Sequence, residues 1–208
     1  MSNLTLAIGR PTIADRVLPR SIVLDAVLVV AGVALTAIAA QISVPLWPVP
    51  ITGQTLAVLL VGVTLGAVRA GISLALYAVV GVLGLPVFSQ ASSGWSVLAG
   101  PTGGYIIGFV FAAVLTGWLA QLEWDRKLPK ALVAFFAGSI VPFAFGLPWL
   151  AVSLGKLGYP NDLNSVLTAG FYPFIVGGII KAVIGAGLIS LAWFLVRRSE
   201  ARKSTVTK

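Results

Sequence analysis

The chain has 208 residues, of which 58% are hydrophobic and only 10% are charged, and its formal net charge is +8. A soluble domain carries roughly 25% charged residues, so this chain has too little polar surface to cover a water-soluble globule. Because the sequence contains neither cysteine nor histidine, it excludes disulfides, thiolate metal sites, a cysteine nucleophile and the commonest general base.

Six apolar segments follow one another along the chain, and a helix needs about 20 apolar residues to cross the hydrocarbon core of a bilayer. They are residues 22–42, 54–68, 70–87, 103–121, 131–154 and 171–196. Glycines flank Arg69 between the second and third segments, which indicates a turn there and not one long helix. We predict an all-α membrane protein with six transmembrane helices in residues 21–198, an N-terminal tail (1–20) and a C-terminal tail (199–208).

The basic residues predict an orientation. Twelve of the fourteen lie in the N-terminal tail, at Arg69, in the loop 123–130 and from Arg197 to the end of the sequence, which share one side of a six-helix protein. Cytoplasmic segments are enriched in Lys and Arg, so both termini are expected to be cytoplasmic. This pattern accounts for the positive charge without a nucleic-acid partner. The first twenty residues have no apolar core, so we expect no cleavable signal peptide.

Two connections on the opposite side have an unusual composition. Pro45, Pro48 and Pro50 surround Trp47, and residues 89–101 are polar, glycine-containing and uncharged. Irregular backbone at membrane depth is tolerated only where it is buried in protein or lines a cavity. We expect these connections to fold over the outer mouth of the bundle as a lid or re-entrant loop. Ordinary tight surface loops are the alternative.

Lys181 is the most informative single residue. It lies about halfway along the last apolar segment, ~15 Å from its start and therefore near mid-bilayer. A lysine there costs roughly 2.5–3.5 kcal/mol, and the six acidic residues all lie in tails, loops or the first turn of the first segment. A compact cation without an internal counter-ion suits a carboxylate ligand. The alternative is a lysine satisfied by backbone carbonyls or water.

Two glycine pairs and several absent motifs complete the pattern. Gly103-Gly104 and Gly177-Gly178 allow close approach either of a neighbouring helix or of a ligand.

No G-x-x-x-x-G-K-[ST] phosphate loop and no H-E-x-x-H motif occurs. We therefore predict a protein that is not an enzyme, with no catalytic or metal-binding residue. An intramembrane enzyme using a serine paired with Lys181 is a minor alternative.

Three motifs stand out, namely AQISVPLWPVPITGQT at residues 40–55, GLPVF at 84–88 and GPTGGY at 100–105. Together they resemble the BioY family, the biotin-specific S components of energy-coupling-factor (ECF) transporters. The match continues through Arg69 and reaches Lys181, covering residues 30–190 with a weak stretch from 121 to 170. The resemblance implies an S-component-like six-helix bundle in a bacterial cytoplasmic membrane.

The resemblance also implies a ligand and partners. Biotin would be the transported substrate, not a cofactor, and would bind beneath the outer loops. Lys181 would meet its carboxylate, Ser92 would meet its ureido ring with Tyr105 close by, and Gln54 matches the glutamine of the proline-rich motif. A transmembrane coupling subunit and two cytoplasmic ATPase subunits would supply the energy, in agreement with the missing phosphate loop.

The chain departs from the family pattern at two positions. Many relatives carry aspartate where this chain has Gly178, and some carry asparagine where it has Ser92. The ureido ring would then be bound through backbone groups or water, or the ligand is another small carboxylate. A scaffold subunit without a ligand is a further alternative.

Overall fold

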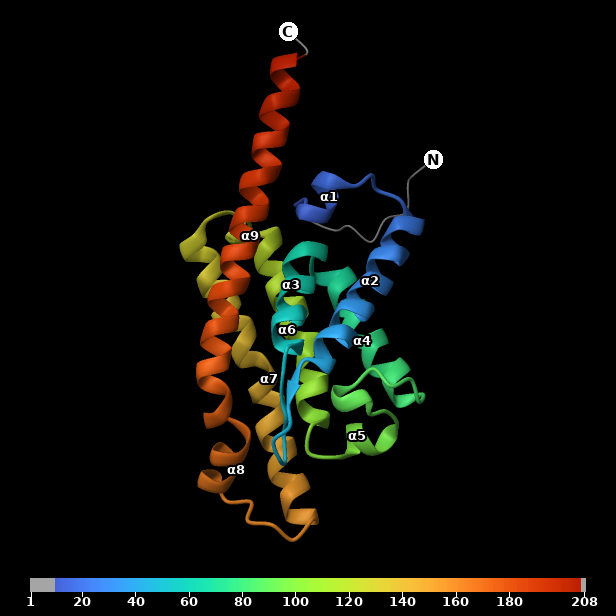
Figure 1. Ribbon diagram of the computed structural model, residues 1–208, viewed down its shortest axis with the longest axis vertical. Coiled ribbons are helices and arrows are strands. Elements are labelled where there is room, and N and C mark those ends of the chain that lie inside the picture. Colours follow the sequence, from blue (N-terminus) through green and yellow to red (C-terminus); the bar gives the residue numbers. More distant parts are fainter. Residues whose placement is uncertain (1–9, 207–208) are drawn as a thin grey trace.

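The computed structural model describes residues 10–206, without the side chains of 201 and 203–206, and the described chain is almost entirely helical (Figure 1). Residues 1–9 and 207–208 of the two predicted tails lie outside the described part. The long helices are α2 (Ile22–Gln41), α3 (Gln54–Leu65), α4 (Ala67–Val82), α6 (Gly103–Gln121), α7 (Leu128–Lys156) and α9 (Tyr172–Val206). The short helix α1 (Ile13–Val17) precedes α2. The connections between the long helices contain α5 (Trp95–Ala99), α8 (Leu163–Gly170), the 3-10 turns η1 (Ser89–Ala91) and η2 (Trp124–Arg126), and the antiparallel strands β1 (Ser43–Val44) and β2 (Ile51–Thr52).

Four described helices are long and apolar enough to cross a membrane, namely α2, α6, α7 and α9. The helices α3 and α4 are apolar but shorter, with 12 and 16 residues. The expected break between them is present, but it lies at Gly66, which has a φ of 81°. Arg69 was expected in the turn itself and instead lies inside α4. The last helix continues through the predicted tail as far as Val206.

The core forms around α6, which packs against α3, α4 and α7 (Figure 1). Small residues make this close packing possible. A Cβ added at Gly62 of α3 would lie 2.8 Å from the carbonyl oxygen of Ala113 in α6, and one at Gly117 of α6 would lie 2.5 Å from the amide nitrogen of Ala67. Such distances are too short for a side chain, so both glycines are required for these helix contacts.

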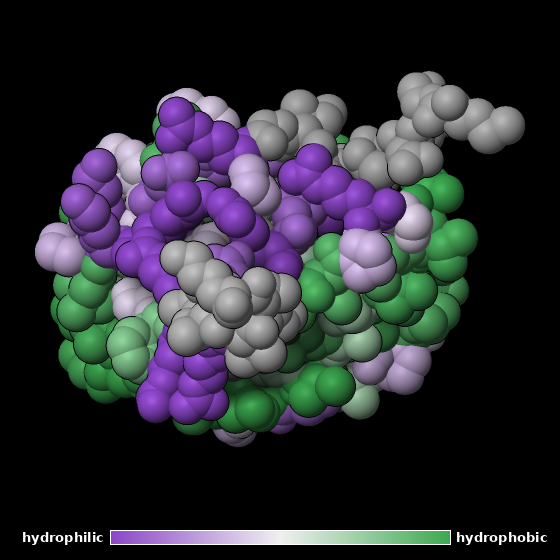
Figure 2. Space-filling model, turned by 90° about the horizontal axis from the view of Figure 1, so that it is seen from above, coloured by the Kyte–Doolittle hydropathy of each residue, from purple (hydrophilic) through white to green (hydrophobic). Residues whose placement is uncertain are grey.

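The outward faces of α2 and α9 are apolar, with exposed side chains such as Val23, Val27, Val176 and Phe194. Figure 2 shows the end of the molecule that carries both termini, where hydrophilic residues gather and hydrophobic residues lie around them. An apolar surface with a polar end is the pattern of a helix bundle surrounded by lipid.

A buried ion cluster closes this polar end. The guanidinium of Arg69 is 2.8 Å from a carboxylate oxygen of Asp15 and 3.1 Å from one of Asp25, and all three side chains are buried. Arg20 reaches the same Asp15 from the surface at 3.8 Å. Asp15 also accepts a hydrogen bond from the backbone N–H of Thr12 at the start of α1. The cluster therefore ties α1 to α2 and α4, with Arg69 buried beneath α1 and not in the turn where it was predicted.

Replacing Arg69 by methionine leaves two carboxylates without their buried partner. Breaking one side of a buried ion pair costs about 3–5 kcal/mol, so Arg69→Met is expected to lower the free energy of unfolding in detergent by that amount. The control is Arg16→Met, which removes an exposed pair with Glu200 and is expected to cost less than about 1 kcal/mol. Equal losses in the two variants would contradict a structural role for the cluster.

Candidate functional site

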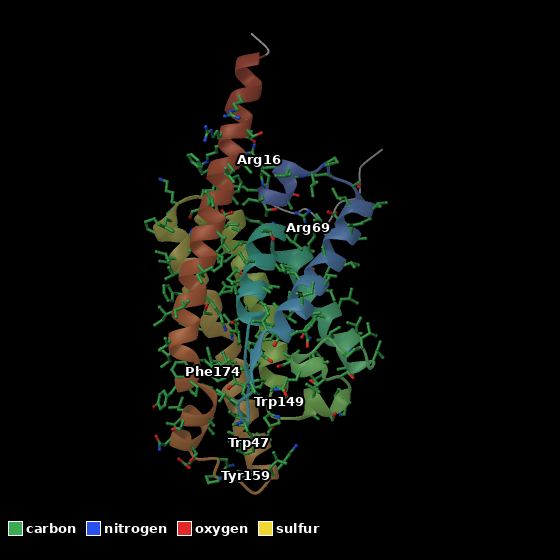
Figure 3. The ribbon with its side chains drawn as sticks, in the orientation of Figure 1. Arg16, Trp47, Arg69, Trp149, Tyr159 and Phe174 are labelled. Atoms are coloured by element: carbon green, nitrogen blue, oxygen red, sulfur yellow. The ribbon has the colours of Figure 1, made fainter. Side chains whose placement is uncertain are left out.

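A cavity of about 520 Å³ lies between the helices and the two uncharged connections. This volume is typical of a small-molecule site. Trp47 and Phe174 contribute to its lining, and Figure 3 shows both toward the end of the molecule away from Arg16 and Arg69. The connection after α2 and the connection before α6, both expected to cover the bundle, line this cavity together with α3, α6, α7 and α9.

The structure brings all five residues that the sequence singled out for ligand binding to the wall of this one cavity. They are Gln54 at the start of α3, Ser92 after η1, Tyr105 in α6, and Gly178 and Lys181 in α9. Within residues 10–206, no three His, Cys, Asp or Glu side chains form a group that could hold a metal ion.

The ammonium of Lys181 reaches from α9 to the start of α3. It donates hydrogen bonds to the backbone carbonyl of Thr52 at 2.5 Å and to the hydroxyl of Thr55 at 3.1 Å. None of the ion pairs among the described side chains includes Lys181. Since an ammonium has three N–H donors and two are engaged, one remains for a ligand and the positive charge stays uncompensated. One of the two acceptors is a backbone carbonyl, in partial agreement with the alternative prediction of a lysine satisfied by backbone carbonyls or water.

A chain of hydrogen bonds continues from this point. The Thr52 hydroxyl donates to Gln54 Oε1 at 2.9 Å, and Gln54 Nε2 donates to the Tyr77 hydroxyl at 2.6 Å. That hydroxyl donates in turn to the carbonyl of Val87 at 2.9 Å. Sequence reasoning did not assign Thr52, Thr55 or Tyr77 to the site. The two threonines lie inside the proline-rich motif, which was the available signal, whereas nothing in the sequence marked Tyr77.

The connection that carries Ser92 is held in an unusual conformation. Gln90 and Ala91 have φ values of 58° and 53°, which residues other than glycine adopt rarely. Gln41, at the end of α2, accepts a hydrogen bond from the amide of Ala91 at 3.0 Å and so holds this turn. The Ser92 hydroxyl donates to the carbonyl of Ser89 at 2.7 Å, so only its oxygen lone pairs remain for a ligand.

Aromatic rings form another wall of the cavity. The Tyr105 ring packs edge-on against Phe143 at 5.9 Å and is stacked with Phe174 at 6.4 Å. Its hydroxyl donates to the carbonyl of Gly170 at 2.9 Å, so Tyr105 offers a ligand mainly its apolar ring. The ring centroids of Trp47 and Tyr159 are 4.5 Å apart, and this contact joins the connection after α2 to the connection after α7 (Figure 3).

The two glycine pairs have different surroundings. Gly103 and Gly104 begin α6 where a Cβ on Gly104 would collide with Trp149 of α7. The indole of Trp149 also donates to the carbonyl oxygen of residue 100 at 2.9 Å. A Cβ at Gly177 or Gly178 would meet no atom within 4 Å. The first pair therefore serves helix packing, and the second leaves room beside Lys181.

The other end of α9 is anchored by a second polar contact. The indole N–H of Trp193 donates to the carboxylate of Asp125 in η2 at 2.5 Å, and the guanidinium of Arg126 lies over the indole at 4.8 Å. Burial raises the pKa of the Asp125 carboxyl to about 6, against the opposing effect of the Trp193 hydrogen bond. These contacts fix the helix that carries Lys181.

The glycine pairs generate a matched test. Gly104→Ala is expected to lower the free energy of unfolding by about 1–3 kcal/mol, because overpacking displaces Trp149. Gly177→Ala is expected to raise it by about 0.5–1 kcal/mol, because alanine favours a helix and the space is free. Thermal unfolding in detergent measures both. Tolerance of alanine at position 104 would contradict the packing described for α6 and α7.

The fold and the cavity define a helical, apolar protein with a small-molecule site at one end of its bundle. A crystal structure of the S-component for biotin from an ECF-type ABC transporter shares this fold, with a TM-score of 0.68 and 25% identity over 81% of this chain and 89% of that chain. The biotin transporter BioY of Thermotoga maritima is 37% identical, covering 79% of this chain and 93% of that protein. The biotin transporter BioY of Rhizobium etli is 36% identical, covering 80% and 89%.

A sequence model of the BioY family matches residues 12–198. The chain belongs to the BioY family, as the resemblance of its three motifs implied.

Proposed function

We propose that this chain is the biotin-binding S component of an ATP-driven uptake transporter. The relatives named above are biotin transporters, and the similar crystal structure is that of a biotin S-component. The observation that carries the proposal is the ammonium of Lys181, which lies on the wall of a ligand-sized cavity without an acidic partner among the described residues. Biotin offers one carboxylate on a mostly apolar chain, which matches one cation in a mostly apolar cavity.

In the proposed binding mode, the biotin carboxylate accepts a hydrogen bond from the remaining N–H of Lys181, whose ammonium lies near the start of α3. The aliphatic chain and the thioether ring lie against Tyr105 and the other aromatic rings. The ureido ring lies toward Ser92, where backbone groups of the irregular connection supply donors and acceptors. Gly178 contributes space and no carboxylate, so the ureido contacts differ from those expected of relatives that carry aspartate there.

The proposed membrane arrangement has six crossings. The four long helices span fully, and the shorter pair α3 and α4 crosses as a hairpin turned at Gly66. Residues 21–198 form the membrane domain, and both termini lie in the cytoplasm at the polar end with its basic residues (Figure 2). The connections around the cavity face the outside of a bacterial cytoplasmic membrane, as a lid or re-entrant loop through which biotin enters.

The proposed energy source lies in partner subunits. The sequence has no phosphate-binding loop of the G-x-x-x-x-G-K-[ST] type. A transmembrane coupling subunit and two cytoplasmic ATPase subunits would drive the reorientation that releases biotin inside. The chain itself binds the substrate and performs no chemistry on it.

The carboxylate contact is tested with biotin and biotin methyl ester. Lys181→Met keeps the side-chain length and removes the charge. Loss of a hydrogen bond to a charged group costs about 1.5–3 kcal/mol, so biotin affinity is expected to fall roughly 10- to 150-fold, whereas ester affinity changes little. Titration calorimetry of the purified protein measures both. Equal affinity of the unsubstituted protein for acid and ester would refute the assignment.

A different small carboxylate is the second candidate for the transported ligand. The observation that favours it is the open space at Gly178, which the ring system of another ligand could occupy. Mass spectrometry of the ligand that co-purifies with the protein decides between them. Biotin supports the first candidate, and another carboxylic acid supports the second.

A further inference from the structure

Tyr77 is fully buried in α4 and does not line the cavity, yet it contacts two separate parts of the cavity wall. On one side its hydroxyl accepts a hydrogen bond from Gln54, which lines the cavity. On the other side the same hydroxyl donates to the carbonyl of Val87, next to the lining residue Phe88. The ring of Tyr77 also packs edge-on against Phe88 at 5.5 Å.

These bonds fix the orientation of the Gln54 amide. The Tyr77 hydroxyl has one proton and gives it to Val87, so it meets Gln54 as an acceptor and requires an N–H from it. The opposite edge of the amide, Oε1, accepts the hydroxyl of Thr52. One N–H of Gln54 is engaged in this way, and the second remains for a ligand.

The Gln54 amide and the ammonium of Lys181 belong to one hydrogen-bonded network. Thr52 joins the two, because its backbone carbonyl accepts from Lys181 while its hydroxyl donates to Gln54. A carboxylate has two oxygens and accepts several hydrogen bonds, so one carboxylate can bind the free N–H of Lys181 and the free N–H of Gln54 together. If the amide were turned over, the carboxylate would meet an oxygen lone pair in place of an N–H.

We propose that Tyr77 is a positioning residue for ligand capture, which holds the Gln54 amide so that its free N–H binds the ligand carboxylate together with Lys181. This inference rests on the proposed function, because it requires a carboxylate at Lys181. Through Val87 and Phe88, the same tyrosine fastens the outer connection to this carboxylate site.

Tyr77→Phe removes the hydroxyl and keeps the ring against Phe88. The readout is the ratio of the affinities for biotin and biotin methyl ester, since a purely structural defect lowers both affinities together. The ratio is expected to fall about 10-fold, the lower end of the range for a lost hydrogen bond to a charged group. Ser73→Ala is the matched control, because this buried hydroxyl lies one turn earlier in α4 and bonds only the carbonyl of Arg69. It is expected to leave the ratio unchanged.

A double-mutant cycle with Gln54→Ala shows whether Tyr77 acts through Gln54. Gln54→Ala alone is expected to lower the ratio as much as Tyr77→Phe, which keeps the proposal testable if the tyrosine variant does not fold. Adding Tyr77→Phe to Gln54→Ala is expected to have no further effect. Equal loss of acid and ester affinity in Tyr77→Phe, or additive effects in the double variant, would overturn the proposal.

The acid-to-ester affinity ratio of the unsubstituted protein distinguishes a failure of the proposed function from a failure of the role of Tyr77. A ratio near one before any substitution overturns the carboxylate assignment and this inference together. A high ratio that Lys181→Met abolishes and Tyr77→Phe preserves overturns the role of Tyr77 and leaves the proposed function standing.

Discussion

The cost of holding an ammonium inside an apolar helix is the constraint on which this end of the molecule depends. The ammonium of Lys181 needs hydrogen-bond acceptors close to its position along α9. The carbonyl of Thr52 and the hydroxyl of Thr55 accept these bonds. These acceptors are available because the β1–β2 hairpin brings the start of α3 against α9. No ion pair among the described side chains includes Lys181, and in the proposed function this charge attracts the carboxylate of the ligand.

Arg69 shows the opposite solution to the same problem. Its side chain is almost completely buried, but Asp15 and Asp25 form ion pairs with it and compensate its charge. One end of the bundle is thereby closed by a saturated ion cluster under α1, while the other end keeps an unsaturated cation in a cavity. This asymmetry is what a subunit needs if it accepts a carboxylate from one side of a membrane only.

The number and order of the long helices could be predicted from sequence, because helix length and hydropathy are local properties. The five expected site residues all line the cavity. Lys181 was marked by its place in an apolar run, and Gln54 and Tyr105 by two of the motifs. Ser92 and Gly178 were named from their positions relative to the family pattern. Contacts between distant segments could not be predicted. The return of α1 onto Arg69 and the bond from Gln54 to Tyr77 depend on tertiary packing. The pairs Gly103-Gly104 and Gly177-Gly178 are alike in sequence, and only their neighbours distinguish packing from open space.

In the proposed binding mode, the carboxylate of biotin meets the ammonium of Lys181 inside this cavity. An experimental structure of the protein with biotin bound is the decisive measurement. We expect a carboxylate oxygen within about 3 Å of Lys181 Nζ, the hydrogen-bonding distance of a charged pair, and a ureido ring toward Ser92. A bound biotin with its ureido ring at Lys181 and its carboxylate at the outer connection would refute this binding mode.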